Sequence, residues 1–162
     1  MNDDRVAPCS RQGGGAAFAA LVERNRDAVY GVAVNMCTSP AAAAEVTRQA
    51  FLAAWRESSY SPTPRDARTW LLGIAMRMAL AERARGPTRP SVSASISVAG
   101  ALRQTLDAMD DGVRGALVLR DVLDVPPRDG AVILGVPEEE FRSRVHRARL
   151  ALGRFIDRFQ AA

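Results

Sequence analysis

The sequence predicts an all-α protein of two small helical domains joined by a flexible linker, with a helix-turn-helix in the second domain. Apolar residues recur at spacings of three and four along most of the 162 residues, which is the period of a helix with one buried face. No segment convincingly alternates apolar and polar residues as a half-buried strand does, and no hairpin dipeptide stands between two such segments. Residues 86–100, GPTRPSVSASISVAG, are small, polar and interrupted by proline, as linkers are. The domains are therefore expected at residues 16–85 and 101–162.

Three helices are predicted in the first domain. Residues 1–15 precede it as a leader that we expect to be disordered, and they lack the basic-then-apolar pattern of a secretion signal. Ser39 suits a helix cap and Pro40 suits the first turn that follows it. Residues 58–66, SSYSPTPRD, are a loop by their serine and proline content. The helices are therefore expected at residues 16–37, 41–57 and 67–85.

The second domain ends in a pattern typical of a helix-turn-helix, in which the second helix enters the major groove of DNA. A short apolar helix is followed by a turn at Gly135 and then by a longer charged helix. Many helical hairpins share this pattern. Gly130 inside the short helix is expected to cost about 1 kcal/mol and to leave a packing gap. The helices are expected at residues 101–109, 112–123, 128–134 and 138–158.

The charge of the chain favours an anionic partner. The net charge is +4 and the pI is near 10.0, and such a balance attracts polyanions. All 22 basic residues are arginine, a bias that the coding composition of a genome would also produce. Residues 101–162 carry ten arginines and ten acids, so only local placement can make that domain basic. No apolar run approaches the 18 or so residues of a membrane span, and we expect a cytoplasmic protein without membrane insertion.

The chain lacks the residues that most enzyme and metal sites require. Cys9 and Cys37 are the only cysteines and His146 is the only histidine, too few for a metal site with the usual ligand spacing. A disulfide framework is not expected either. The glycines at 13–15 follow no strand, unlike those of a nucleotide-binding loop. We therefore expect no metal, no cofactor and no enzymatic activity.

The last helix opens with three glutamates and continues with five arginines in thirteen positions. Negative charge suits the first turn of a helix, and Glu138–Arg142 and Glu140–Arg144 have the four-residue spacing of favourable pairs. These pairs leave three arginines without an acid nearby along the helix, namely Arg147, Arg149 and Arg154. The helix is either a surface helix whose charges pair with one another or a helix that binds a negatively charged partner. Its buried stripe is expected to comprise Phe141, Val145, Ala148, Leu152, Phe155 and Ile156.

Two sets of motifs resemble the bacterial sigma factors, and most closely their extracytoplasmic-function branch. LGVPEEEFRSRVHRARLAL, with MDDGVRGALVLRDVL before it, is similar to the promoter-binding domain of that family. AEVTRQAFLAAWRES and ARTWLLGIAMRMALAERAR are similar to its polymerase-binding and −10-reading helices. The motifs occur in the order of the family. The resemblance implies a non-enzymatic factor that binds core RNA polymerase and promoter DNA, assists strand opening, and is inhibited by an anti-sigma factor.

The resemblance also assigns residues to each of these contacts. The polymerase would be bound by Glu45, Arg48, Gln49, Phe51, Leu52 and Trp55. The −10 element and the melted strand would be bound by Tyr60, Arg65, Arg68, Trp70 and Arg77. The −35 duplex would be bound by Glu140, Arg142, Ser143, Arg144, His146, Arg147 and Arg149. Simpler interpretations stay open, since both tryptophans have the spacing of core residues, and Tyr60, Arg65 and Arg68 suit a solvated surface.

Several positions depart from the family pattern. Arg48 and Gln49 stand where the family has a glutamine–glutamate pair, and Arg77 stands where it has asparagine. Pro126 and Pro127 replace a serine–aromatic pair. The three glutamates would repel phosphates unless one accepts from a cytosine amino group. The chain is therefore either a working alternative sigma factor or a divergent sigma-like DNA-binding regulator or interaction module with weakened polymerase binding.

Overall fold

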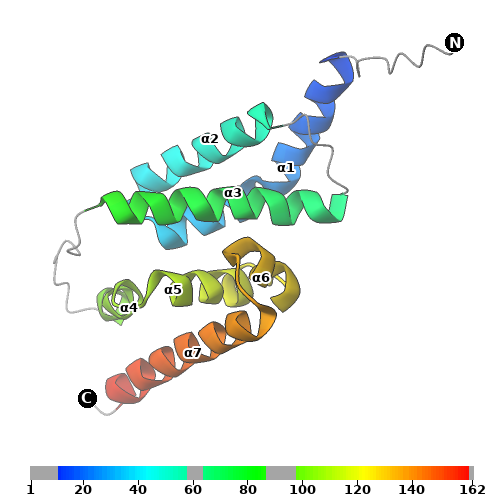
Figure 1. Ribbon diagram of the computed structural model, residues 1–162. Coiled ribbons are helices and arrows are strands. Elements are labelled where there is room, and N and C mark those ends of the chain that lie inside the picture. The colour runs from blue at the N-terminus through cyan, green and yellow to red at the C-terminus, as the bar shows by residue number, and fades with distance from the viewer. Residues whose placement is uncertain (1–10, 58–63, 87–97, 161–162) are drawn as a thin grey trace, which may run out of the picture.

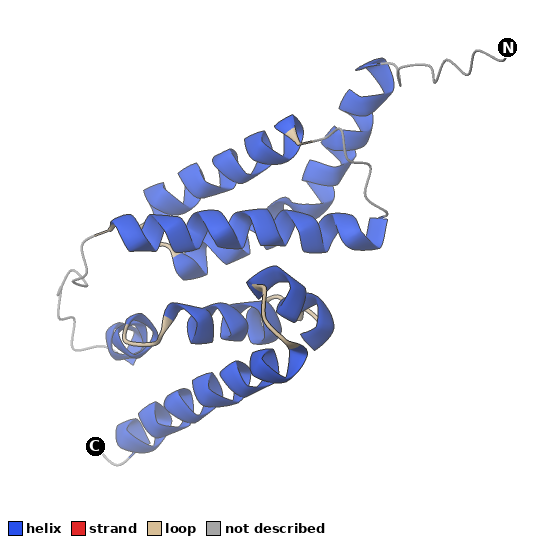
Figure 2. Ribbon diagram, viewed as in Figure 1, coloured by secondary structure: helices blue, strands red, loops and turns tan. Residues whose placement is uncertain are grey.

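The computed structural model describes residues 11–57, 64–86 and 98–160. Throughout these ranges the chain forms helices joined by short turns, without any strand, as Figures 1 and 2 show. The all-α prediction is confirmed. The helices are α1 (Arg11–Met36), α2 (Pro40–Arg56), α3 (Pro64–Arg85), α4 (Val98–Asp107), α5 (Asp111–Leu117), the π-helix η1 (Val118–Val122), α6 (Pro127–Leu134) and α7 (Glu138–Gln160).

Four features of the helices differ from those expected. Helix α3 begins at Pro64, inside the loop expected at residues 58–66. Helix α1 begins at Arg11, so the last part of the expected leader is helical. Helix α4 begins at Val98, inside the expected linker, of which residues 87–97 lie outside the described residues. The helix expected at 112–123 is regular only as far as Leu117 and then widens into η1.

The ends of the helices follow from local sequence. The amide of Ala42 donates to the hydroxyl of Ser39 at 3.2 Å, which caps α2 ahead of Pro40. Asp110 caps α5 by accepting from two backbone amides, at 2.9 and 3.2 Å. Gly135 ends α6 with φ +65°, a left-handed conformation that glycine adopts without a Cβ penalty.

Helix α3 lies at the centre of the molecule, with α1 and α2 on one side and the second half of the chain on the other (Figure 1). Its residues 71–76 are all buried. A helix that is buried around its whole circumference needs neighbours on every side. The second half supplies this cover through α6 and through α5, whose Gly115 lies against Met76, so the two halves pack against each other.

One apolar core runs through both halves. Leu72 and Met76 of the first half belong to the same buried cluster as Leu119, Ile133 and Phe141 of the second. The sulfur of Met76 lies 3.4 Å from the point where a Cβ at Gly115 would sit. The absence of a side chain at this position of α5 therefore lets the two halves come close.

Three arginines lie where the two halves meet, and they donate hydrogen bonds to the last backbone carbonyls of α1 and of the turn after it. Arg114 donates to Asn35 at 2.7 Å, Arg83 to Met36 at 3.0 Å and Arg103 to Thr38 at 3.2 Å. Helix termini leave such carbonyls without partners inside the helix, and positive charge suits this end. We call Arg83, Arg103 and Arg114 the arginine cap.

Two aspartates hold the arginine cap in place. Asp107 pairs with Arg114 at 2.5 Å, and Asp111 pairs with Arg83 at 2.6 Å. Arg114 is only 4% exposed, and a buried guanidinium requires such a partner. At the boundary between the halves, the three guanidinium groups of the arginine cap therefore have backbone carbonyls and carboxylates as hydrogen-bond or ion-pair partners.

The packing gap expected at Gly130 is absent. A Cβ built at Gly130 would overlap the ring of Phe141, whose Cε1 would be 2.9 Å away. The fully buried ring of Phe141 therefore fills the space that the glycine leaves. The short helix α6 and the long helix α7 meet at this contact.

Candidate nucleic-acid and polymerase interfaces

Helix α7 buries one stripe, largely as predicted. Phe141, Val145 and Ala148 are buried, and Leu152 is half-buried against them. Ile156 is 50% exposed, so its assignment to the core was wrong. The last part of α7 borders a groove that is also lined by residues of α4, of α5 and of the turn between them.

Four arginines of α7 are paired with acids of the protein. The predicted pairs are confirmed, with Arg142 at 2.6 Å from Glu138 and Arg144 at 2.8 Å from Glu140. Arg147 also donates to Glu140, at 3.0 Å. The expectation that it has no acid nearby was wrong, because its side chain reaches back over two turns.

Arg149 is held by an acid that is distant in sequence. Its Nε and terminal nitrogens donate to the two carboxylate oxygens of Asp121 at 3.0 and 2.6 Å. Asp121 lies in η1, 28 positions earlier, so no pattern within α7 could have revealed it. The hydrogen bond from Arg149 lowers the pKa of Asp121, which keeps the carboxylate charged.

The exposed side of α7 consists of a weakly charged strip between two arginine flanks. Arg142 and Arg149 lie on one flank, and Arg144 and Arg147 lie on the other. The strip between them contains four exposed residues at helical spacing. We call these the outer strip, and they are Glu139, Ser143, His146 and Leu150.

Arg144 is less available to DNA than the other three arginines. Its side chain is 25% exposed, and its Cζ lies 3.2 Å from the point where a Cβ at Gly112 would sit. Its guanidinium therefore covers the start of α5 while it is paired with Glu140. Hydrogen bonding from Arg144 lowers the pKa of Glu140, so this pair stays charged at neutral pH.

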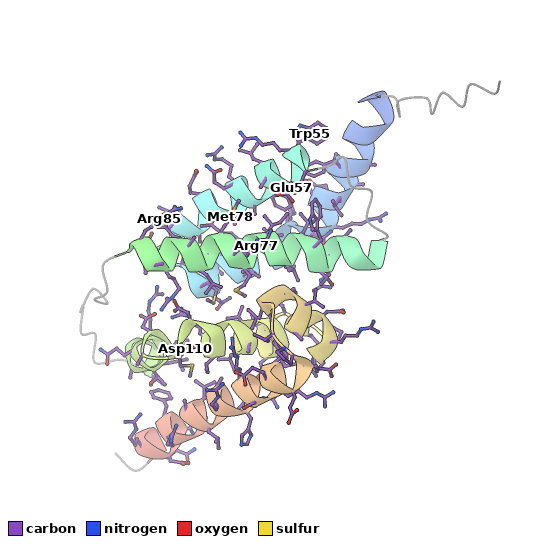
Figure 3. All side chains as sticks on the ribbon, in the orientation of Figure 1. Trp55, Glu57, Arg77, Met78, Arg85 and Asp110 are labelled. Carbon is purple, nitrogen blue, oxygen red and sulfur yellow. The ribbon has the colours of Figure 1, made fainter. Side chains whose placement is uncertain are left out.

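The residues expected at the −10 element are in different environments. Arg77 is exposed near the middle of α3, where Figure 3 labels it. Arg68 is exposed too, and donates to the carbonyl of Leu123 at 3.3 Å across the boundary between the halves. Trp70 packs half-buried against the core. Arg65 is part of α3, and Tyr60 lies outside the described residues.

The residues expected to bind the polymerase lie together on the outer face of α2. Glu45, Arg48, Gln49 and Leu52 are exposed, whereas Phe51 is half-buried against the core. Trp55, at the end of α2 in Figure 3, is 47% exposed. Its ring meets that of Phe18 edge to face, with centroids 5.0 Å apart. The face thus offers both polar and apolar groups.

The acid on this face is already engaged. Arg48 donates to both oxygens of Glu45, at 2.6 and 2.9 Å, and Gln49 donates at 2.7 Å. These hydrogen bonds lower the pKa of Glu45 to about 2. The face therefore carries a carboxylate whose charge is balanced by its own neighbour.

Other kinds of site find little support in the described part of the chain. It contains no group of three or more His, Cys, Asp or Glu residues that could hold a metal. Cys37 is buried, and burial raises the pKa of its thiol. None of the described helices combines the length and the apolar character needed to cross a membrane.

Both halves of the chain match known families. Residues 21–86 match sigma-70 region 2, and residues 99–152 match sigma-70 region 4. An ECF RNA polymerase sigma factor SigK of Mycobacterium sp. (strain KMS) is 34% identical over 98 residues, which cover 60% of this chain and 50% of SigK. The chain thus spans about half the length of the SigK relatives that it matches. RNA polymerase sigma-H factor of Pseudomonas aeruginosa is 24% identical over 93% of this chain and 91% of its own length.

Solved structures share the fold. CnrH, determined in complex with the cytosolic domain of CnrY, superposes with a TM-score of 0.73 at 23% identity, over 90% of this chain and 91% of CnrH. RpoE of Bartonella quintana, determined in complex with the anti-sigma factor NepR, superposes with a TM-score of 0.72 at 18% identity. The match covers 87% of this chain and 97% of RpoE. The matches to regions 2 and 4 together span well over half of the sequence, in the order of the family. The chain therefore belongs to the sigma-70 family, in its extracytoplasmic-function branch, with region 2 in the first half and region 4 in the second.

Proposed function

We propose that this chain is an alternative sigma factor, which binds core RNA polymerase and directs it to promoters with a −10 and a −35 element. The occurrence of regions 2 and 4 in one chain carries the proposal, because initiation requires one part for each element. Such a factor acts in the cytoplasm and is not itself an enzyme.

The surfaces described above support a division of labour. The exposed face of α2 provides Leu52 and Trp55 for contact with the polymerase. Helix α7 carries arginines on both flanks of its outer strip, an arrangement that suits phosphates on either side of a major groove. Arg68 and Arg77 are exposed cations of α3 that suit the −10 element. We also propose an anti-sigma partner, since the structurally similar RpoE was determined in complex with the anti-sigma factor NepR.

The pairing of Glu45 with Arg48 supports a second candidate function, that of a sigma-like regulator with weakened polymerase binding. A partner surface rich in arginine would meet a carboxylate that is already neutralised. Replacement of Arg48 with glutamine and of Gln49 with glutamate would restore free negative charge at this face.

The two functions are separated by the affinity of the full chain for core RNA polymerase at physiological salt. The unmodified chain is expected to form a stable complex that starts transcription at selected promoters. A complex formed only by Arg48→Gln/Gln49→Glu would favour the regulator, and no complex with either chain would contradict the sigma-factor assignment. Arg26→Gln is a matched control, because Arg26 is also an exposed arginine beside a glutamate three positions earlier.

A further inference from the structure

We propose that Glu139 is a specificity-determining residue of α7, which accepts a hydrogen bond from the N4 amino group of a cytosine in the −35 duplex. This inference rests on the proposed entry of α7 into the major groove. It assigns base reading to Glu139, in place of Glu140, which the sequence alone had suggested.

The three neighbouring glutamates differ in their partners. Glu138 accepts from two nitrogens of Arg142, at 2.6 and 3.1 Å. Glu140 accepts from Arg144 at 2.8 Å and from Arg147 at 3.0 Å. Glu139 is exposed and has no ion pair or side-chain hydrogen bond with any described residue. It is therefore the one glutamate of this turn whose charge the described protein leaves uncompensated.

The position of Glu139 also differs from that of its neighbours. It belongs to the outer strip with Ser143, His146 and Leu150, which faces away from the buried stripe. The first residues of the second helix reach the base edges in a helix-turn-helix. Glu138 and Glu140 are turned towards the arginine flanks instead, where their pairs fix them.

An unpaired carboxylate at this place has one favourable use in a DNA complex. Phosphates on both sides of the groove repel it, and among the bases a carboxylate is suited to the amino group of cytosine. The strip provides further groups for base reading, since Leu150 offers an apolar contact for a thymine methyl group and Ser143 offers a hydroxyl. The strip thus reads bases while the arginine flanks bind the backbone.

The alternative is that Glu139 only stabilises the start of the helix. That role belongs equally to all three glutamates, because each lies in the first turn. A comparison of Glu139→Gln with Glu138→Gln therefore separates the two roles. Both substitutions remove one negative charge from the same turn.

The test is selection of sequences by the full chain from a pool of duplexes with a randomised −35 element. The wild-type chain is expected to enrich cytosine at one position, and Glu139→Gln to lower that preference by about 5- to 150-fold. Glu138→Gln is expected to leave the preference intact. If Glu139→Gln binds all sequences more tightly with an unchanged preference, the carboxylate only repels phosphates and the inference is overturned.

Failure of the wider proposal is recognised separately. If the wild-type chain enriches no sequence, α7 does not read DNA and the inference falls with that role. The affinity for core RNA polymerase, which depends on α2, is measured in its own experiment. If the chain binds the polymerase and selects DNA sequences independently of Glu139, the proposed function stands and only the role of Glu139 is overturned.

Discussion

Arg114 donates to the backbone carbonyl of Asn35 across 79 positions of the sequence, at 2.7 Å. This hydrogen bond joins α5 to the end of α1, and the same side chain pairs with Asp107. The first and second halves of the chain are thereby connected through a buried charge. Regions 2 and 4 are therefore held together by hydrogen bonds and ion pairs as well as by apolar packing.

Replacement of Arg114 with methionine is expected to lower the free energy of unfolding by about 1–3 kcal/mol, since it removes the donor to the Asn35 carbonyl and the short pair with Asp107. Asp107 keeps only the longer contacts with Arg83 at 3.9 Å and Arg103 at 4.0 Å. Arg103→Met is the control. Arg103 belongs to the same cap but its side chain is 58% exposed, so its loss should cost less than about 1 kcal/mol. Urea denaturation of both variants measures the difference. Equal losses in the two variants would show that the buried Arg114 contributes no more to the free energy of unfolding than the exposed Arg103.

Gly130→Ala is expected to destabilise the protein by about 1–3 kcal/mol, because the new methyl group overlaps the Phe141 ring. The control is Gly153→Ala in α7, where the added methyl group meets no atom within 4 Å. That change should stabilise the helix by about 0.5–1 kcal/mol. A double-mutant cycle with Phe141→Leu would then show coupling, because the smaller side chain makes room. Additive effects would argue against direct contact.

Glu140→Gln is expected to strengthen binding to duplex DNA of any sequence and to steepen its salt dependence. The substitution removes the acid that holds Arg144 and Arg147. Each arginine that gains a phosphate adds about 0.9 to the slope of log K against log salt. Arg147→Ala should reduce the slope by a similar amount, and Arg26→Ala in α1 should leave it unchanged. Equal slopes in all variants would place α7 outside the DNA interface.

The carboxyl group of Glu45 is expected to titrate at a pH of about 2, where its pKa has been lowered by hydrogen bonds from Arg48 and Gln49. The lowered pKa means that this interaction is fully present above the pKa of the unfolded chain and is lost as the pH falls through about 2. NMR titration of the side-chain carboxyl carbon gives the midpoint directly. In Arg48→Gln the midpoint should rise, and an unchanged midpoint would mean that Arg48 does not hold the carboxylate in solution.

The two halves are expected to stay together after the chain is cut between them. A protease site inserted within residues 87–97 allows the cut, and size-exclusion chromatography shows whether the fragments elute together. Association is expected because Met76 and Leu72 share a core with Leu119 and Phe141. The cut chain that also carries Arg114→Met should dissociate more readily. Separate elution of the unsubstituted fragments would show that the halves are independent domains.

The helices and their ends were predictable because the signals are local. Ser39 and Gly135 act within a few residues of their own position, and capping and turn preferences describe such contacts. The four-residue pairs of α7 were predictable for the same reason. The predicted helices therefore agree with the structure except at the starts of α1, α3 and α4 and in the π-helical turn.

The remaining contacts depend on which helices meet. Arg149 finds Asp121, and Arg114 finds Asn35, only after the second half has folded onto itself and onto the first. Gly130 suggested a gap because the sequence does not show that Phe141 occupies its space. The selection of Glu139 among three equal glutamates likewise required the partners of the other two.

Because α3 is buried on opposite sides, the second half of the chain competes, within the same molecule, with any partner for one side of α3. Any partner that uses the side of α3 now covered by α5 and α6 must displace them. A tethered competitor acts at a fixed effective concentration, of the order of millimolar for a short connection, however dilute the protein is. The affinity measured for such a partner is then the difference between two binding free energies. A substitution that loosens the shared core would lower stability and at the same time raise that affinity.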